Sequence, residues 1–330
     1  MFQQRSFVIA ADDGSTVLPD GMPKAVKVPA AAATPNIGFV FTGQGAQWPQ
    51  MGLSLMEEYP GCLATIRRLD SYLDHLDEGF GRSWSIEGVL KENAEHSQVH
   101  QAELSQPLVT ALQIMIVNLL SQWGITSRAV VGHSSGEIAA GYAAGLLTEQ
   151  EAIIVAYLRG KAVASNRSQG LMMAVGGSLS EIQPLVDEYD GAIVIACHNS
   201  PESYTLSGDA DAINTLKTRL DEKKIFCRVL QTNNNAYHSD HMKPLGPAYE
   251  RDLDQFMQRK SAAKVLKQAS KTGTPQAVFF SSVYGHAAPW SVLSSKYWRQ
   301  NLESPVLFYQ GVSELVTQTP VDILLEIGPQ

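Results

Sequence analysis

The sequence predicts an α/β protein in which helices cover an open parallel sheet and a smaller α/β unit is inserted into the chain. Two strand-then-helix units, around Phe39 and around Val131, are typical of a parallel sheet with helices on both faces. Between Leu171 and Gln231 the strands and helices follow their own order, βαββαβ. With 330 residues, 44% of them hydrophobic, the chain can bury the cores of both units.

The folded body is predicted to begin near Pro35. Residues 1–34 contain Asp-Gly, Pro-Asp-Gly and Pro-Ala-Ala-Ala-Ala stretches, which are typical of a linker segment. Residues 36–41 are a predicted strand, followed by a loop of small residues over 42–47. Gly43-Gln44-Gly45 lacks both the third glycine of GxGxxG and the Walker lysine, so it does not match a phosphate-binding loop. The alternative interpretation, that this loop at the end of a strand donates backbone N–H groups to a ligand, remains possible.

The second strand-then-helix unit turns sharply at Gly132-His133-Ser134-Ser135-Gly136. This GxSxG pattern fits a nucleophile elbow, in which a strand turns directly into a helix and the central serine is pushed outward into solvent. The flanking glycines are needed because the two backbones pass too close for a Cβ atom. Residues 129–132 are a predicted buried strand, and the following helix has an acid, Glu137, in its first turn. Ser134 is therefore a candidate nucleophile, with a tightly packed structural turn as the alternative.

A helix over residues 149–165 is predicted from the capping box at Thr148 and Glu151. Arg159 lies on its apolar face, because the residues at i−7, i−4, i−3, i+3 and i+4 are all small or apolar. A buried guanidinium needs an anion. Two interpretations remain: an internal salt bridge with an Asp or Glu, or a bidentate clamp for a substrate carboxylate.

The inserted unit has the order of the split βαβ, or ferredoxin-like, arrangement. A cleft between this unit and the larger domain is the natural place for a ligand. Its six predicted elements are strands at 171–175, 192–197, 204–207 and 226–230 and helices at 180–189 and 210–223.

The chain returns from the small unit through Asn235-Ala236-Tyr237-His238, and His238 is the candidate base. A histidine in such a place is more often a surface loop residue, but a serine hydroxyl needs a neighbouring base to be nucleophilic near neutral pH. His238 and His241 at i, i+3 are an alternative metal pair, yet no third ligand and no HExxH motif accompanies them. We therefore expect no metal.

Composition excludes several other classes of function. The net charge is −8, and no basic stripe with interleaved aromatic residues is present, so a nucleic-acid partner is not expected. The chain has three cysteines, Cys62, Cys197 and Cys227, which lie far apart in the sequence. Their odd number and wide spacing argue against a disulfide framework and favour a reducing, cytoplasmic setting. The apolar run at 112–120 is broken by Gln113 and Asn118, so no membrane segment is expected.

Taken together, eight short motifs resemble one known family. They are similar to the malonyl-CoA:acyl carrier protein acyltransferases, and more narrowly to the acyltransferase domain of iterative, fungal highly reducing polyketide synthases. The resemblance covers residues 35–330, and residues 5–9 resemble the end of the linker that precedes such domains. Because the family usually continues beyond this C-terminus, an excised or recombined domain is expected. The motifs are Phe41-Thr42-Gly43-Gln44-Gly45-Ala46-Gln47, Gln106-Pro107, Gly132-His133-Ser134-Ser135-Gly136-Glu137, Arg159-Gly160, Asn199-Ser200-Pro201, Asn235-Ala236-Tyr237-His238-Ser239, Ser304-Pro305-Val306 and Glu326-Ile327-Gly328-Pro329.

This resemblance implies a role for each matching residue. Ser134 is the nucleophile and His238 the general base, in a dyad whose imidazole is oriented by a backbone carbonyl, placed at Leu307. The backbone N–H groups of Gln44 and Ser135 form the oxyanion hole. Arg159 pairs with the malonyl carboxylate. The other residues implied to bind substrate are Gln106, Asn199, Asn235 and Tyr237.

The implied reaction moves a malonyl group from malonyl-CoA, through a malonyl-serine ester, to the phosphopantetheine thiol of an acyl carrier protein. The coenzyme A thioester is a substrate and no cofactor is bound. The implied partners are the carrier protein and the neighbouring ketosynthase and linker domains of the parent synthase. The implied domains are a hydrolase-like core over 35–168 and 236–330 and a ferredoxin-like subdomain over 169–235.

Alternative functions stay open from the sequence alone. An α/β-hydrolase-type serine hydrolase or thioesterase also uses GxSxG, but it needs an Asp or Glu between the serine and a late histidine, where this chain has the inserted unit. A scaffold with a dead elbow would not need Ser134, His238 and Arg159 together. A methylmalonyl-selective relative often has Tyr-Ala-Ser-His, and the bulky Tyr237 in place of that serine favours malonyl.

Overall fold

The computed structural model describes residues 4–5, 26–27, 34–76, 82–264 and 277–329, and its chain divides into two units, Met1–Pro35 and Asn36–Gln330. In the first unit the described residues are the antiparallel pair β1 (Gln4–Arg5) and β2 (Val26–Lys27). Most of the predicted linker over 1–34 lies outside the described residues. The features discussed below all belong to the second unit.

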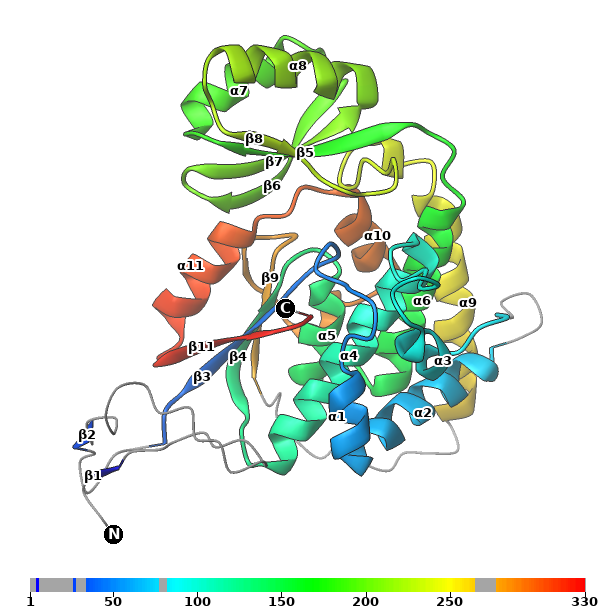
Figure 1. Cartoon of the computed structure of the whole chain (residues 1–330). Coiled ribbons are helices and arrows are strands. Elements are labelled where there is room, and N and C mark those ends of the chain that lie inside the picture. The colour runs from blue at the N-terminus through cyan, green and yellow to red at the C-terminus, as the bar shows by residue number, and fades with distance from the viewer. Residues whose placement is uncertain (1–3, 6–25, 28–33, 77–81, 265–276, 330) are drawn as a thin grey trace. The chain divides into compact units, whose positions relative to one another are not determined.

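The larger sheet of the second unit has the strand order β10-β9-β4-β3-β11, and its four longer strands are parallel (Figure 1). The predicted strands at 36–41 and 129–132 are its two central strands, so the predicted parallel sheet is confirmed. Apolar β-branched and aromatic residues on both faces suit a strand that is covered on both sides. The strands are β3 (Ile37–Phe41), β4 (Ser127–Gly132), β9 (Val278–Ser281), β10 (His286–Ala287) and β11 (Ile323–Ile327).

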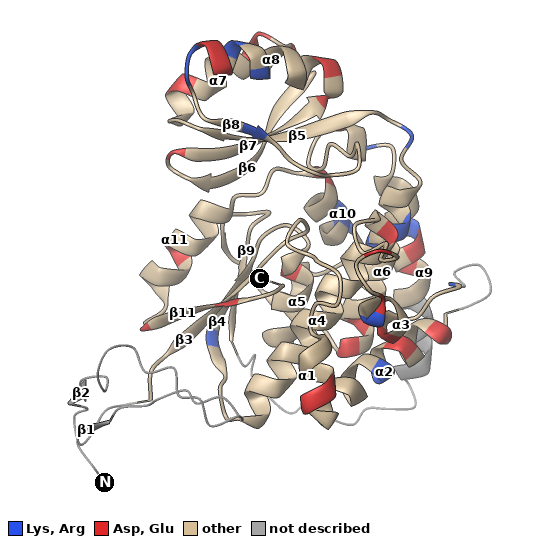
Figure 2. Cartoon of the chain, in the orientation of Figure 1, with Lys and Arg blue, Asp and Glu red and all other residues tan. Residues whose placement is uncertain are grey.

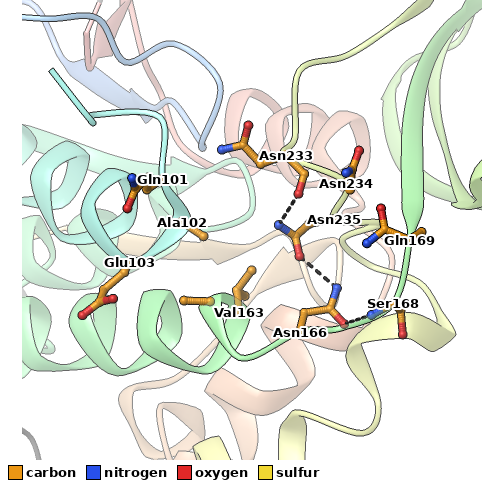
Figure 3. A pocket seen from close by; sticks show the side chains of 11 residues that line it. Gln101, Ala102, Glu103, Val163, Asn166, Ser168, Gln169, Asn233, Asn234 and Asn235 are labelled. Atoms are coloured by element: carbon orange, nitrogen blue, oxygen red, sulfur yellow. Dashed lines mark hydrogen bonds between the residues drawn. The ribbon is translucent and has the colours of Figure 1, made fainter. Parts of the chain in front are cut away.

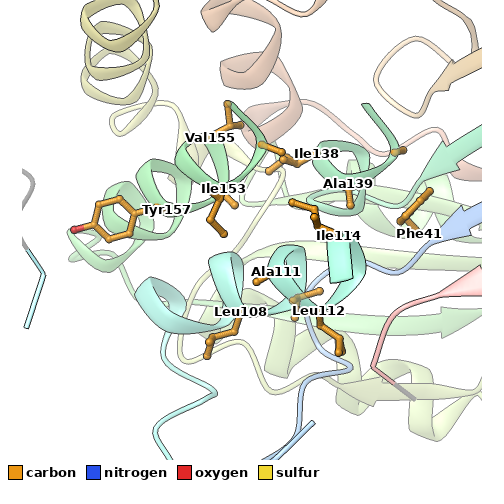
Figure 4. Close-up of a cluster of buried hydrophobic side chains, with 14 of the residues drawn as sticks. Phe41, Leu108, Ala111, Leu112, Ile114, Ile138, Ala139, Ile153, Val155 and Tyr157 are labelled. Atoms are coloured by element: carbon orange, nitrogen blue, oxygen red, sulfur yellow. The ribbon is translucent and has the colours of Figure 1, made fainter. Parts of the chain in front are cut away.

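Helices cover both faces of this sheet. On one face, α4 (Ala102–Gln122), α5 (Gly136–Ala143) and α6 (Glu149–Ala164) pack around a core of side chains such as Phe41, Ile114 and Ile138 (Figure 4). On the other face, α11 (Phe308–Gln318) packs on β4 and β9. Further helices extend the first side: α1 (Leu53–Glu58), α2 (Pro60–Asp74), α3 (Ile86–Lys91), α9 (Gly246–Lys264) and α10 (Ser295–Glu303).

Helix α4 alone among the described helices is long and apolar enough to cross a membrane, and 72% of its apolar window is buried inside the protein. It packs against α2 and α6, which is the environment of a core helix. Residues of both charge signs lie on α2, α3, α8 and α9, among other elements (Figure 2).

The smaller unit is a four-stranded antiparallel sheet with the order β6-β7-β5-β8 and its own hydrophobic core. This is the predicted ferredoxin-like order, and all six predicted elements are present within three residues of their predicted bounds. The domain boundaries at 168 and 235 stay a prediction. The elements are β5 (Gly170–Gly176), α7 (Leu179–Asp187), β6 (Ile193–Ser200), β7 (Ser203–Asp209), α8 (Ala210–Glu222) and β8 (Cys227–Val229).

Backbone hydrogen bonds join the smaller sheet to the segment before α11. The Val306 N–H donates to the Ala196 carbonyl and the His198 N–H donates to the Val306 carbonyl, each over 2.8 Å. Cys197 and Val306 thereby form a parallel bridge. This pairing fixes the backbone between α10 and α11 relative to β6, a relation that the sequence analysis did not foresee.

The close approach of two backbones at the elbow requires glycine at position 132. A Cβ atom at Gly132 would lie 2.2 Å from the Glu137 backbone nitrogen, which cannot move without displacing α5. We expect Gly132→Ala to lower the free energy of unfolding by at least about 3 kcal/mol, as overpacking against backbone does. Urea denaturation measures this. Gly176→Ala is the control, because its Cβ would make ordinary contacts of 3.4 Å or more; equal losses for the two variants would contradict the prediction.

Candidate active site

Ser134 sits at the sharp turn between β4 and α5, as the GxSxG pattern predicted. Its φ of +53° is unusual for a residue other than glycine, and the turn brings the two backbones so close that Gly132 and Gly136 leave no room for a Cβ atom. The expectation that the serine points into solvent is wrong: Ser134 is only 8% exposed. It is buried because side chains from other parts of the chain, Arg159 and His238, contact its hydroxyl.

His238 lies against Ser134, with 2.7 Å between the serine Oγ and the imidazole Nε2. The other ring nitrogen, Nδ1, lies 2.8 Å from the backbone carbonyl of Ser304. A carbonyl can only accept, so Nδ1 carries the proton and Nε2 is left free to accept from the serine hydroxyl. This is the arrangement of a nucleophile and its base.

The orienting carbonyl is a correction to the sequence analysis, which placed it at Leu307. The Leu307 carbonyl instead accepts from the Gly311 N–H over 3.0 Å, because Leu307 is the N-cap of α11. Ser304 is the C-cap of α10, where a helix leaves carbonyls without an intrahelical partner. The histidine therefore uses a carbonyl at a helix end rather than one already engaged in the next helix.

Burial shifts the titration of His238. The side chain is 3% exposed, and the cost of desolvating a cation, together with the nearby Arg159 charge and His133, lowers its pKa to about 3. The hydrogen bond to the Ser304 carbonyl opposes this shift. The neutral imidazole, which can accept a proton, is thus the resting form across the neutral range.

Arg159 projects from the predicted helix into the same site and is 1% exposed. Its guanidinium donates to the Gln106 side-chain oxygen over 2.9 Å and to the Ser134 Oγ over 3.3 Å. Among the residues described by the structure, no Asp or Glu forms an ion pair with it, and its Nε has no hydrogen-bond partner. Burial lowers its pKa from the usual value. The internal salt bridge considered from the sequence is therefore not found.

Gln106, Gln44 and Tyr237 complete the polar wall around Arg159. The Gln106 side-chain nitrogen donates to the Gln44 side-chain oxygen. The Tyr237 ring centroid lies 5.9 Å from the Arg159 guanidinium carbon, within the range of a cation–π contact. The Tyr237 hydroxyl is buried near both glutamines but makes no hydrogen bond of good geometry with a described residue. The site therefore holds a buried tyrosine hydroxyl and a buried arginine N–H, neither of which forms a hydrogen bond of good geometry with a described residue.

The candidate oxyanion donors are the backbone N–H groups of Gln44 and Ser135. Ser135 directly follows the serine on the elbow, and Gln44 lies in the loop after β3. In the described part of the chain, the backbone N–H of neither residue is used in a hydrogen bond. Both remain available to a ligand oxygen.

Asn199 and Asn235 occupy different places. The Asn199 side-chain oxygen accepts from the His133 Nε2 over 2.9 Å, next to the elbow serine in sequence. The Asn235 oxygen instead accepts from Asn166 over 2.9 Å, in a polar cavity of about 250 Å³ whose lining does not include Ser134 (Figure 3). The Asn235 side chain thus makes its hydrogen bonds within this second cavity, and its substrate contact stays a prediction.

The metal alternative at His238 and His241 finds no support in the described residues. The His241 Nε2 lies 2.6 Å from an Asp209 carboxylate oxygen, away from His238, whose two ring nitrogens are both engaged. Among the residues that the structure describes, no group of three His, Cys, Asp or Glu side chains is placed to hold a metal ion.

The sequence analysis missed the role of Glu137, which it read only as an acid in the first turn of a helix. Glu137 is fully buried and accepts hydrogen bonds from the Tyr297 hydroxyl over 2.7 Å and the Asn301 side chain over 2.8 Å. Burial raises its pKa to about 7. Its burial could have been predicted from the sequence, because the other residues of α5 are apolar or glycine, which indicates a helix buried on all sides.

A serine on a strand-to-helix elbow, hydrogen-bonded to a neutral imidazole at the carboxyl end of a central strand of a parallel sheet, defines an enzyme of the serine acyl-transferring class. The chain belongs to the acyl transferase domain family, whose model matches residues 38–329. It is therefore an acyltransferase.

Fungal reducing polyketide synthases are among its relatives. The chain is 43% identical to the reducing polyketide synthase DEP5 of Fusarium langsethiae, over 99% of this chain and 14% of that protein. It is 41% identical to the highly reducing polyketide synthase srdA of Neurospora crassa, over 98% of this chain and 13% of that protein. The chain thus spans about one seventh of the length of these relatives.

Solved structures show the same fold. A loading acyltransferase from the avermectin modular polyketide synthase aligns with a TM-score of 0.76 and 25% identity, covering 89% of this chain and 87% of that one. A malonyl CoA-acyl carrier protein transacylase from Clostridium perfringens aligns with a TM-score of 0.74 and 20% identity, over the same shares. The predicted fold class, a hydrolase-like parallel sheet with a ferredoxin-like insertion, is confirmed.

The low pKa of His238 predicts an unusual pH profile for acylation. An imidazole with a pKa of 6.5 is mostly protonated at pH 5, so a base-dependent rate would fall about twentyfold between pH 7 and pH 5. With a pKa of about 3 the base stays neutral, and we expect kcat/KM for an acyl thioester to change less than about twofold over this interval. Stopped-flow release of coenzyme A measures it, with circular dichroism confirming the fold at both pH values. A rate that halves near pH 6.5 would contradict the expectation.

Proposed function

We propose that this acyltransferase moves a malonyl group from malonyl-CoA to the phosphopantetheine thiol of an acyl carrier protein. The observation that carries the proposal is the buried Arg159 guanidinium, which lies 3.3 Å from the Ser134 Oγ and has no carboxylate partner among the described residues. A buried cation without an anion is costly, so a substrate that brings its own carboxylate is favoured at this position. The free carboxylate of a malonyl group meets that need.

In the proposed first step, Ser134 attacks the thioester carbonyl while the His238 Nε2 takes the hydroxyl proton. The 2.7 Å contact between these atoms, and the proton held on Nδ1 by Ser304, support this direction of transfer. The tetrahedral intermediate expels coenzyme A as a thiol, after receiving the proton back from His238, and leaves a malonyl-serine ester.

The proposed oxyanion hole is formed by the backbone N–H groups of Gln44 and Ser135. Both are unused in the described part of the chain, and donors that are already aimed need no reorganisation when charge develops. Loss of one such donor typically lowers the rate about a hundredfold or more. The second donor follows the nucleophile directly, as the elbow geometry requires.

In the second step the carrier thiol attacks the ester and His238 acts in reverse. Burial of Ser134 supports transfer over hydrolysis, because water has little access to a residue that is 8% exposed.

We infer that the partners are the carrier protein and the ketosynthase and linker domains of a parent synthase, in the cytoplasm, because the relatives are reducing polyketide synthases. In the proposed reaction the coenzyme A thioester is a substrate, and no cofactor takes part.

The competing functions are less well supported by the site. A hydrolase acting on neutral esters has no use for a buried unpaired guanidinium at the nucleophile, and the base is oriented by a carbonyl rather than by an Asp or Glu. A methylmalonyl group carries an extra methyl, and the bulky, buried Tyr237 ring beside Arg159 leaves less room for it.

Intact-protein mass spectrometry tests the proposal. After brief incubation with malonyl-CoA, we expect the mass of one malonyl group on the native chain and none on Ser134→Ala. With Arg159→Ala, malonylation should fall about a hundredfold while acetylation from acetyl-CoA is retained, because the lost charge-assisted bonds serve only the free carboxylate. Adding a carrier protein with its pantetheine arm should discharge the ester onto the thiol.

Other outcomes would each overturn part of the proposal. Steady release of coenzyme A without a retained ester indicates a hydrolase. Equal labelling by methylmalonyl-CoA and malonyl-CoA contradicts the proposed selectivity, and an ester that survives the carrier thiol contradicts the proposed acceptor. A folded native chain that gives no ester and no turnover indicates a non-catalytic binding domain.

Tyr237→Phe tests the unused hydroxyl. We expect this hydroxyl to donate to the malonyl carboxylate beside Arg159, because it is buried near Gln44 and Gln106 without a partner in the described residues. A hydrogen bond to a charged group contributes about 1.5 kcal/mol or more, so KM for malonyl-CoA should rise about tenfold while KM for acetyl-CoA stays unchanged. Steady-state kinetics with both thioesters measure this. An unchanged ratio of the two KM values would show that the hydroxyl does not bind substrate.

A further inference from the structure

Glu137 is a buried carboxylate that the proposed chemistry does not use. It lies three residues after the nucleophile, in the first turn of α5, and is fully buried. Its two oxygens accept from the Ser282 backbone N–H, the Tyr297 hydroxyl and the Asn301 side-chain nitrogen. A buried carboxylate with this many donors is rigidly held, so its partners are held in turn.

Two of these partners, Tyr297 and Asn301, belong to α10, which packs beside the elbow. The Asn301 side-chain nitrogen also donates to the Ser134 backbone carbonyl over 3.0 Å. Ser134 has a strained positive φ, and strained conformations persist only where surrounding contacts over-determine them. Asn301 thus joins the carboxylate to the backbone of the nucleophile.

The same helix also holds the base. Its C-cap is Ser304, whose carbonyl accepts from the His238 Nδ1 over 2.8 Å. Helix α10 therefore contacts the nucleophile through Asn301 and the base through Ser304, three residues apart on one helix end. Whatever fixes α10 against the elbow fixes the distance between Ser134 and His238.

We propose that Glu137 is a positioning residue that anchors α10 through Tyr297 and Asn301 and thereby aligns the Ser134 hydroxyl with the His238 imidazole. Glu137 itself touches neither reacting group. Its effect is transmitted by the helix, so it acts on the chemical step and leaves substrate affinity, which depends on Arg159 and Gln106, unchanged. This inference rests on the proposed function of Ser134 and His238.

Glu137→Gln is the central variant. The amide keeps the shape of the side chain, but only one of its two terminal atoms can accept a hydrogen bond. It therefore cannot accept from the Ser282 N–H on one atom and from Tyr297 and Asn301 on the other at the same time. We expect kcat for acyl-serine formation to fall about tenfold or more, with KM for malonyl-CoA changed less than about twofold, as loss of an interaction needed only in the transition state requires.

Glu149→Gln is the matched control. Glu149 is a partly buried carboxylate at the start of α6, which accepts from Arg68, Asn118 and, at the far end of α5 from the elbow, the Tyr142 hydroxyl. It forms no hydrogen bond with Ser134, His238 or a described residue of α10. We expect it to lower Tm and to leave kcat unchanged. If Glu137→Gln lowers Tm but keeps the kcat of the control, or raises KM at constant kcat, the positioning role is overturned.

Proton NMR of His238 separates this inference from the proposed function. The Nδ1–H that donates to the Ser304 carbonyl is buried and should give a slowly exchanging signal in the native chain and in Glu149→Gln. We expect this signal to shift and broaden in Glu137→Gln, and also in Tyr297→Phe, which serves if the first variant does not fold. An unchanged signal overturns the inference. A native chain that lacks acyl transfer while the signal responds overturns only the proposed function.

Discussion

The imidazole of His238 is the point at which three distant parts of the chain meet. It contacts the hydroxyl of Ser134, 104 residues away, and the carbonyl of Ser304, 66 residues away. The contact with Ser134 is buried and the one with Ser304 is partly buried, and His238 itself holds a positive φ of +60°. The neutral ring is the resting form, because a buried imidazolium would face the Arg159 charge. The large sheet, the return segment and α10 must all be in place before this geometry exists.

Two buried charges of opposite sign have opposite surroundings. Glu137 is surrounded by donors and is satisfied within the protein, as buried charges usually are. Arg159 has one amide and the serine hydroxyl as acceptors, and no carboxylate partner among the described residues. The protein satisfies the Glu137 carboxyl group, whose pKa burial raises to about 7, with its own donors, whereas in the proposed function a substrate carboxylate pairs with Arg159. Such incomplete pairing of a buried group is typical of binding sites.

Local sequence patterns predicted the elements of the site well. The capping box and the apolar face placed Arg159 on a buried helix, and the paired glycines placed Ser134 on an elbow, because both patterns depend on backbone geometry within a few residues. The ferredoxin-like order followed from alternating strand and helix periods. His238 was identified by the need for a base and by the family resemblance, since its own surroundings in the sequence are those of an ordinary loop.

The sequence by itself determined which residues can do chemistry here: a serine that must turn between glycines, an arginine on an apolar helical face and a histidine on the returning chain. Only the tertiary structure decided how far each of these residues is buried and which groups form hydrogen bonds with it. It buried Ser134, assigned the orienting carbonyl to Ser304 instead of Leu307, and placed Asn235 in another cavity. These choices depend on the pairing of β6 with Val306 and on the packing of α10 against Glu137. No local pattern encodes them, because hydrogen bonds between distant segments depend on how whole elements align.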